Sequence, residues 1–122
     1  MILGIGNDIV EIERIEKVIS NEKFLKRVYT KKEKEIIEKK GNKAASYAGR
    51  FSAKEAISKA LGTGVRDFNL TDIEILNDEL GKPYVVLKNQ LKDRMVNVRI
   101  EISISHSKKY ATAVAVMFKK EC

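Results

Sequence analysis

Hydrophobic positions in the first quarter of the chain predict one strand followed by short helices. Residues 2–10 are rich in Ile and Val, which is typical of a strand, and Gly4 and Gly6 favour close approach of another backbone. Residues 12–29 carry apolar side chains at helical spacing, with a break at residues 20–21. We therefore expect a strand that leads directly into two short helices.

Two longer helical patterns follow. Thr30 and Glu33 have the spacing of a capping box and Gly41 is a suitable helix end, which predicts a charged helix whose Lys and Glu residues form a solvated face. From residue 42 to residue 61 the apolar residues recur at helical spacing, and a glycine-rich segment then ends the predicted helix. The residues expected on the polar side of this helix are Arg50, Lys54, Glu55, Ser58 and Lys59.

The C-terminal half of the chain predicts strands. Residues 70–76 and 83–87 flank a turn-forming segment and predict a hairpin, followed by a short helix near residues 89–95. Residues 99–105 and 111–118 alternate in the manner of strands. The side chains that share one face are, in the first strand, Ile100, Ile102, Ile104 and His106, and in the second Ala111, Ala113 and Ala115, with Thr112, Val114, Val116 and Phe118 on its other face. The expected fold class is α+β, a small antiparallel sheet packed with helices.

Composition and length narrow the class of protein. The 122 residues are expected to form one domain over residues 1–122, and 43% hydrophobic residues with a single proline are typical of a folded chain. Because Cys122 is the only cysteine, an intrachain disulfide or a cysteine-based zinc site cannot form, which favours the reducing cytoplasm. No apolar run approaches the ~20 residues of a membrane span, and the N-terminus lacks a signal-peptide pattern, so no membrane partner is expected.

The formal net charge of +7 favours an anionic partner: a nucleic acid, a phosphorylated metabolite or an acidic protein. Residues 1–40 and residues 65–122 each hold 10 basic and 8 acidic residues, whereas residues 41–64 hold 4 basic residues and 1 acidic residue. The excess charge therefore lies on the predicted central helix. A small nucleic-acid-binding module is the alternative from another class, but the predicted sheet lacks the aromatic stretch on which RNA bases stack.

Each candidate site residue, taken alone, also has a structural interpretation. Asp8, near the end of the first strand, has the position of a cap for the following helix. Glu55 and Lys59 have the i, i+4 spacing of a surface salt bridge. His106, the single histidine, ends an apolar strand face, and its neighbour Ser105 points to the opposite face, which argues against a serine–histidine nucleophile pair.

Three motifs occur together, in order, along nearly the whole chain. They are GIGNDIVEI (residues 4–12) with Arg14-Ile15, RFSAKEA (residues 50–56) with KALGTG (residues 59–64), and SISH (residues 103–106) with Tyr110-Ala111. The turn Gly81-Lys82-Pro83 also fits. In this combination the chain resembles the holo-acyl-carrier-protein synthases, a family of 4′-phosphopantetheinyl transferases.

The resemblance implies the 4′-phosphopantetheinyl transferase fold and an enzyme of fatty acid biosynthesis. Such an enzyme transfers the phosphopantetheine arm of coenzyme A to a serine of an apo acyl carrier protein and releases 3′,5′-ADP. Two carboxylates suit Mg²⁺, and the matched acids are Asp8 and Glu55, which are expected to be metal ligands and catalytic residues. The residues expected to bind coenzyme A are Lys59, His106, Arg50, Gly62, Thr63 and Gly64. Those expected to bind the acidic carrier protein are Arg14, Lys23 and Arg27.

Some roles stay open within this resemblance. Larger, fused-duplicate transferases have a second acid two residues after the Asp, and Val10 occupies that position here, so a water is expected to replace that ligand. The base that deprotonates the carrier serine is either Glu55, acting through a metal-bound water, or that water itself as hydroxide. Lys54 and Arg50 are expected either to add positive electrostatic potential near the diphosphate or to pair with neighbouring groups in a structural role. A non-catalytic binder is disfavoured because both expected metal ligands are present.

The resemblance also implies a homotrimer with shared active sites. The strands offer more apolar surface than one layer of helices covers, from Ile100, Ile102, Ile104, Val114, Val116 and Phe118. His106 of one subunit is expected to serve the site of Asp8 and Glu55 in its neighbour. The alternative is a monomer in which these three residues meet within one chain.

Overall fold

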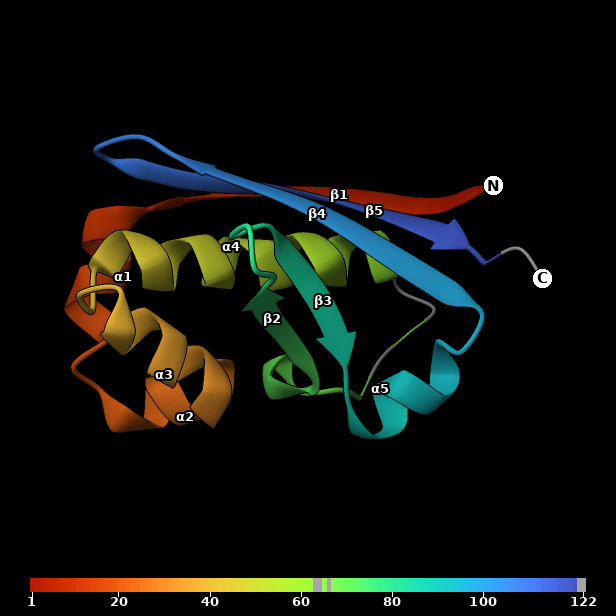
Figure 1. Ribbon diagram of the computed structural model, residues 1–122, viewed down its shortest axis with the longest axis horizontal. Helices are drawn as coiled ribbons and strands as arrows, with labels where there is room; N and C mark the ends of the chain where they lie inside the picture. Colours follow the sequence, from red (N-terminus) through yellow and green to blue (C-terminus); the bar gives the residue numbers. More distant parts are fainter. Residues whose placement is uncertain (63–64, 66, 121–122) are drawn as a thin grey trace.

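The computed structural model describes residues 1–62, 65 and 67–120. Its helices and strands form the α+β arrangement expected from the sequence (Figure 1). In chain order the elements are β1 (Ile2–Glu11), α1 (Ile12–Val18), α2 (Glu22–Val28), α3 (Lys31–Lys39), α4 (Ala44–Leu61), the 3₁₀ helix η1 (Leu70–Asp72), β2 (Ile73–Asn77), β3 (Pro83–Leu87), α5 (Asn89–Arg94), β4 (Val98–His106) and β5 (Tyr110–Lys119). Among the described residues, no helix has the length and apolar character needed to cross a membrane.

The strands form two antiparallel sheets rather than one. β1, β5 and β4 make a three-stranded sheet in that order, and β2 pairs with β3 as the predicted hairpin. On the central strand β5, Ala113 pairs with both Asp8 of β1 and Ile104 of β4. Directly paired residues point to the same face of a sheet, so these three residues share one face. Helix α4 packs across that face and contacts all three strands (Figure 1).

Glycines let β1 and α4 touch backbone to backbone. A Cβ atom at Gly4 would lie 2.2 Å from the carbonyl oxygen of Ala60, and one at Gly6 would lie 2.0 Å from that of Ala56. Both distances are far below van der Waals contact, so no larger residue fits unless the strand moves. The close approach predicted from these glycines is confirmed, and it holds the middle of β1 against α4.

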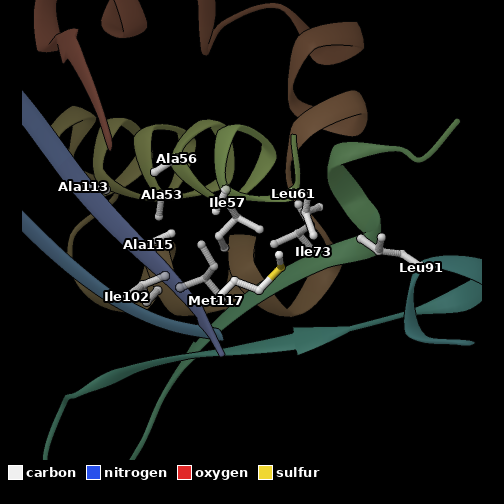
Figure 2. Close-up of a cluster of buried hydrophobic side chains, with 12 residues drawn as sticks. Ala53, Ala56, Ile57, Leu61, Ile73, Leu91, Ile102, Ala113, Ala115 and Met117 are labelled. Atoms are coloured by element: carbon white, nitrogen blue, oxygen red, sulfur yellow. The ribbon is translucent and has the colours of Figure 1, made fainter. Parts of the chain in front are cut away.

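Two clusters of buried side chains join the elements. The first lies between α4 and the sheets and includes Ile57, Ile73 and Met117 (Figure 2). The second joins α1, α2 and α3 to the first half of α4, with Val28 and Tyr47 among its members. This cluster also contains Ala111 of β5, and Val10 of β1 packs against it, so the corner formed by α1, α2 and α3 is anchored to both α4 and the three-stranded sheet.

Local signals placed most element boundaries correctly. The break between α1 and α2 is confirmed, and Thr30 and Glu33 form the predicted capping box of α3. The prediction was wrong for residues 70–72, which form η1 instead of the start of a strand. Asp72 explains the difference, because its Oδ2 accepts a hydrogen bond of 2.9 Å from the backbone N–H of Asn69 and closes a turn.

The predicted polar side of the central helix is wrong at two positions. Arg50 and Lys54 are buried, with exposed fractions of 6% and 0%. Both lie on the side of α4 that also carries Ile57 and Leu61, which pack in the first core cluster. Glu33, expected on a solvated face of α3, is likewise buried. The Nζ of Lys54 lies 2.6 Å from Oε1 of Glu33, and this pairing lets both charges leave the solvent.

Apolar strand residues are also distributed differently from the prediction. The isoleucines of β4 pack toward the first core cluster and do not form an uncovered face; they are Ile100, Ile102 and Ile104. The exposed apolar side chains of this sheet come instead from its other two strands, with Ile5 and Ile9 each 66% exposed and Val114 37% exposed. These side chains alternate with the residues that face α4, so they lie on the opposite face of the sheet.

Candidate active site

Asp8 is held where β1 passes over α4. Its Oδ2 atom accepts a hydrogen bond of 3.2 Å from the hydroxyl of Ser52, and its side chain is only 15% exposed. The backbone carbonyl of Asp8 accepts a bond of 2.8 Å from the hydroxyl of Thr112. Groups from α4 and β5 therefore orient this residue. Asp8 is not the helix cap considered from the sequence, since Glu11 is the N-cap residue of α1.

Lys59 lies beside Asp8. Its Nζ is 3.2 Å from Oδ1 of Asp8 and donates a second hydrogen bond of 3.0 Å to the backbone carbonyl of Asn7. The Lys59 side chain is 56% exposed, and an ion pair of this kind contributes only about 0–1 kcal/mol. The ammonium group is therefore free to turn toward an anionic ligand at small energetic cost.

Glu55, one helical turn before Lys59, completes the group. Burial raises the pKa of Glu55, the nearby carboxylate of Asp8 raises it further, and Lys59 opposes the shift. Asp8 and Glu55 are partly buried and repel one another. Two such carboxylates are suitable ligands for a hard divalent cation such as Mg²⁺. Over residues 1–62, 65 and 67–120, no cluster of three or more His, Cys, Asp and Glu side chains forms, so these two acids stand without a third such ligand.

Asp8 and Glu55 line a cavity of about 590 Å³ bounded by β1, α4 and the helical corner. Arg14 of α1 and Arg27 of α2 line the same cavity, and Phe51 of α4 adds apolar surface. One cavity therefore joins two carboxylates to two guanidinium groups.

Lys23, the third residue expected to contact a carrier protein, does not belong to this lining. It lies on α2, one turn before Arg27, and is exposed. The guanidinium carbon of Arg27 is 6.0 Å from the centre of the Phe24 ring, a cation–π distance. The side chain of Arg27 is thus positioned by its own helix, whereas Lys23 extends the basic surface next to the cavity.

Arg50 and His106 line a second cavity, of about 320 Å³. The Nε of Arg50 donates to the carbonyl of Ile75 at 3.3 Å, and its Nη2 donates to Oδ1 of Asn77 at 2.6 Å. Strand β2 therefore fixes the direction of this guanidinium. His106 is the last residue of β4 and is exposed, and Pro83 of the predicted turn motif lines the same cavity.

His106 is not brought to Asp8 and Glu55 within this chain. It pairs with Ala111 of β5, which pairs in turn with Val10 of β1, so His106 lies two strand spacings, about 10 Å, across the sheet from β1. Helix α4 packs over the face between them and contacts both edge strands. A single chain thus presents the carboxylates and the histidine in separate cavities.

The glycine-rich segment expected at coenzyme A is described only at its beginning. Gly62 is the C-cap residue of α4, three residues after Lys59, and its φ of +70° suits glycine. Thr63 and Gly64 lie outside the described residues.

Two parts of the site were missed from the sequence. Ser52, which orients Asp8, lies within a motif but has no charge to draw attention to it. A structural pair was one of the two roles expected for Lys54 and is the one observed, but its partner Glu33 was expected on a solvated face of α3. Helical spacing contained a signal for Lys54, because this residue lies three positions before the buried Ile57 on the same side of the helix.

The chain is similar to one family along most of its length. The family model described as the 4′-phosphopantetheinyl transferase superfamily matches residues 4–115. A holo-[acyl-carrier-protein] synthase of Fusobacterium nucleatum subsp. nucleatum is 64% identical over 121 residues, covering 96% of this chain and 99% of that protein. A holo-[acyl-carrier-protein] synthase of Clostridium tetani is 50% identical over 126 residues, covering 100% of this chain and 99% of that protein.

Solved structures agree with the observed fold. A holo-(acyl-carrier-protein) synthase from Bacillus anthracis, crystallised in complex with CoA (3′,5′-ADP), is 40% identical with a TM-score of 0.82 and covers 99% of both chains. A holo-[acyl-carrier-protein] synthase from Helicobacter pylori, in complex with coenzyme A, is 36% identical with a TM-score of 0.82, covering 93% of this chain and 99% of that one. The chain therefore belongs to the 4′-phosphopantetheinyl transferase superfamily.

Proposed function

We propose that this chain is a cytoplasmic holo-acyl-carrier-protein synthase. It transfers the 4′-phosphopantetheine moiety of coenzyme A to a serine of an apo acyl carrier protein and releases 3′,5′-ADP. The observation that carries the proposal is the gathering of Asp8, Glu55 and Lys59 beside one cavity, in a chain that is 64% identical to a protein named for this activity.

The transfer exchanges one phosphorus–oxygen bond for another. The serine oxygen of the carrier protein bonds to the phosphorus that bears pantetheine, the bond from that phosphorus to the bridging oxygen of the diphosphate breaks, and 3′,5′-ADP leaves with the electron pair. The serine proton needs an acceptor. That acceptor is either Glu55, acting through a water, or that water itself as hydroxide.

Asp8 and Glu55 are the proposed ligands of Mg²⁺. Burial and the nearby carboxylate of Asp8 raise the pKa of Glu55, and a bound divalent cation would relieve the repulsion between the two acids. When bound, Mg²⁺ supplies positive charge that neutralises the diphosphate. Val10 lines the cavity without a ligand atom in its side chain, so water and substrate oxygens are left to complete the coordination. Lys59 is proposed to meet the diphosphate charge that remains.

The cavity of Arg50 and His106 is proposed to take the nucleotide end of coenzyme A, with Gly62, Thr63 and Gly64 allowing close approach. Within a single chain this cavity lies apart from Asp8 and Glu55. We therefore propose a homotrimer in which the cavity of one subunit faces the carboxylates of its neighbour. The exposed Ile5, Ile9 and Val114 offer an apolar sheet face that such an assembly would cover. Val114 was among the apolar residues expected at such an interface, whereas Ile5 and Ile9 take the place of the β4 isoleucines.

Acidic carrier proteins are proposed to dock on α1 and α2 through Arg14, Lys23 and Arg27. Two of these side chains line the cavity of the proposed metal ligands, and the third lies one turn away on α2. Positive charge at this position would attract the carrier protein and direct its serine toward Glu55.

Incubation of the protein with coenzyme A, Mg²⁺ and several apo carrier proteins tests the function, with intact mass as the measurement. We expect one phosphopantetheine group to be added to the carrier and 3′,5′-ADP to appear in equal amount. Omission of Mg²⁺ with a chelator present should stop the reaction. Unmodified carriers throughout would overturn the proposal in favour of a binding protein.

A further inference from the structure

Buried polar contacts next to the proposed active site converge on Lys54. This residue immediately precedes Glu55 on α4, and its side chain is completely buried. Its Nζ donates to Oε1 of Glu33 at 2.6 Å, to the backbone carbonyl of Leu70 at 3.1 Å and to the backbone carbonyl of Val28. An ammonium group has three protons, so each has an acceptor.

The three acceptors come from separate segments of the chain. Val28 ends α2, Glu33 lies in α3 and Leu70 begins η1. Val28 and Leu70 also line the cavity that contains Glu55. One nitrogen atom of α4 therefore holds two pieces of the cavity wall.

Glu33 is fixed from its other side as well. Its Oε1 accepts a second hydrogen bond, of 2.8 Å, from the backbone N–H of Thr30, and its Oε2 accepts one of 2.9 Å from the backbone N–H of Ile75. The ring of Tyr29 lies 5.7 Å from the Nζ of Lys54. The carboxylate thus links the start of α3 to β2, and it cannot shift without breaking backbone contacts.

A buried ion pair contributes little to stability beyond what an apolar pair of similar volume would contribute. Desolvation of the two charges offsets most of their attraction, and apolar replacements are often neutral or stabilising. An apolar pair lacks direction, however, whereas hydrogen bonds determine which carbonyl faces the ammonium group and at what distance. The distinctive contribution of Lys54 and Glu33 is therefore to position the groups that they bind.

We propose that Lys54 and Glu33 are positioning residues for the transfer reaction, which fix the cavity wall of Val28 and Leu70 relative to Glu55. This inference rests on the proposed function. A carrier serine that enters the cavity must approach both Glu55 and the diphosphate, and a misplacement of about 1 Å in such a site costs about 100-fold in rate. Both side chains are buried and lie outside the cavity lining, so they would act through the groups that they bind.

The test compares the charge-free double variant Lys54→Met/Glu33→Leu with the control Leu91→Ala. Leu91 is fully buried in the first core cluster and does not line the cavity, so its truncation weakens the fold while leaving the hydrogen bonds of Lys54 and Glu33 in place. Both variants are assayed at a temperature at which circular dichroism shows them folded. We expect kcat of the double variant to fall about 10- to 100-fold with KM for coenzyme A within about twofold of the parent. The control should retain the parental kcat.

Amide hydrogen exchange provides a readout that does not require activity. The double variant should exchange faster over residues 26–30 and 70–73, with residues 111–117 unchanged. Parental kcat and parental exchange in the folded double variant would overturn the inference, and so would an equal loss of kcat in Leu91→Ala. If the double variant does not fold, Glu33→Gln takes its place in the same comparison. If the parent modifies no carrier protein, the proposed function fails and the positioning role in transfer fails with it, while the exchange result still decides whether Lys54 and Glu33 fix the cavity wall.

Discussion

Lys59 and Asp8, which are 51 positions apart in the chain, are joined by a hydrogen bond of 3.2 Å from Nζ to Oδ1. The bond spans the junction of β1 and α4, where glycines bring the two backbones into contact. Lys59 also lowers the pKa of Glu55, which burial and Asp8 raise. One lysine therefore faces two carboxylates, and the group keeps an excess of negative charge.

Replacement of either carboxylate by its amide should remove activity and preserve the fold. Asp8→Asn and Glu55→Gln each remove a negative charge from the proposed Mg²⁺ site, and we expect kcat/KM to fall at least about 100-fold, the scale for losing a principal charge-stabilising group. Binding of Mn²⁺, measured by calorimetry, should weaken in both variants. Glu13→Gln, an exposed change on α1, is the matched control and should behave as the parent. Near-parental turnover of either site variant at ordinary Mg²⁺ concentration would contradict the assignment.

Glu55 should weaken the fold at neutral pH when no metal is present. Its pKa is raised in the folded state above the ordinary value of 4.5, so its contribution to stability is favourable below pH 4.5 and is lost as the pH rises through the folded-state pKa. Glu55→Gln should therefore be more stable than the parent at pH 7, by about 0.2–1 kcal/mol for a partly exposed group.

Urea unfolding in the presence of a chelator, from about pH 3 to pH 8, checks this pH dependence. The stability difference between Glu55→Gln and the parent should shrink toward zero at the acidic end, where the carboxyl is protonated in both states. A parent that is more stable than the variant at pH 7 would show that Glu55 is not repelled at its site.

Charge reversal at Arg14 should act on the carrier protein and spare coenzyme A. Arg14→Glu is expected to raise KM for the carrier about 10-fold, which corresponds to about 1.4 kcal/mol of lost attraction. The remaining activity should depend less on salt than that of the parent. Lys17→Glu, on the same helix but outside the cavity lining, is the control and should have a smaller effect. An effect confined to coenzyme A affinity would contradict the proposed docking surface.

Mixing of two inactive variants tests whether sites are shared between subunits. Asp8→Ala and His106→Ala should each be inactive alone. Co-refolded as random homotrimers from equal amounts, they should regain activity at about a quarter of the sites, those that unite an intact carboxylate pair with an intact histidine. Solution mass and activity are the measurements. A monomeric mass, or no recovery in trimers shown to be hybrid, would refute the shared site.

The sequence by itself determined the features that depend on short stretches of chain. Hydrophobic periodicity predicted the helices and most strands. The spacing of Thr30 and Glu33 predicted the start of a helix, and Gly4 and Gly6 predicted a close contact between two backbones. Three ordered motifs indicated the family, which similarity over residues 4–115 confirms. The sequence contains these signals because the local conformation of residues a few positions apart depends mainly on those residues themselves.

Only the tertiary structure decided which charged residues lie inside and which candidate residues meet. Lys54 is buried because Glu33, 21 positions earlier, comes from another helix to pair with it. Asp8 reaches Lys59 because the first strand packs on α4, whereas His106 stays apart because β5 lies between β1 and β4. Burial of a charge and the meeting of distant side chains depend on contacts between elements, and local spacing does not identify the partner residues that make those contacts.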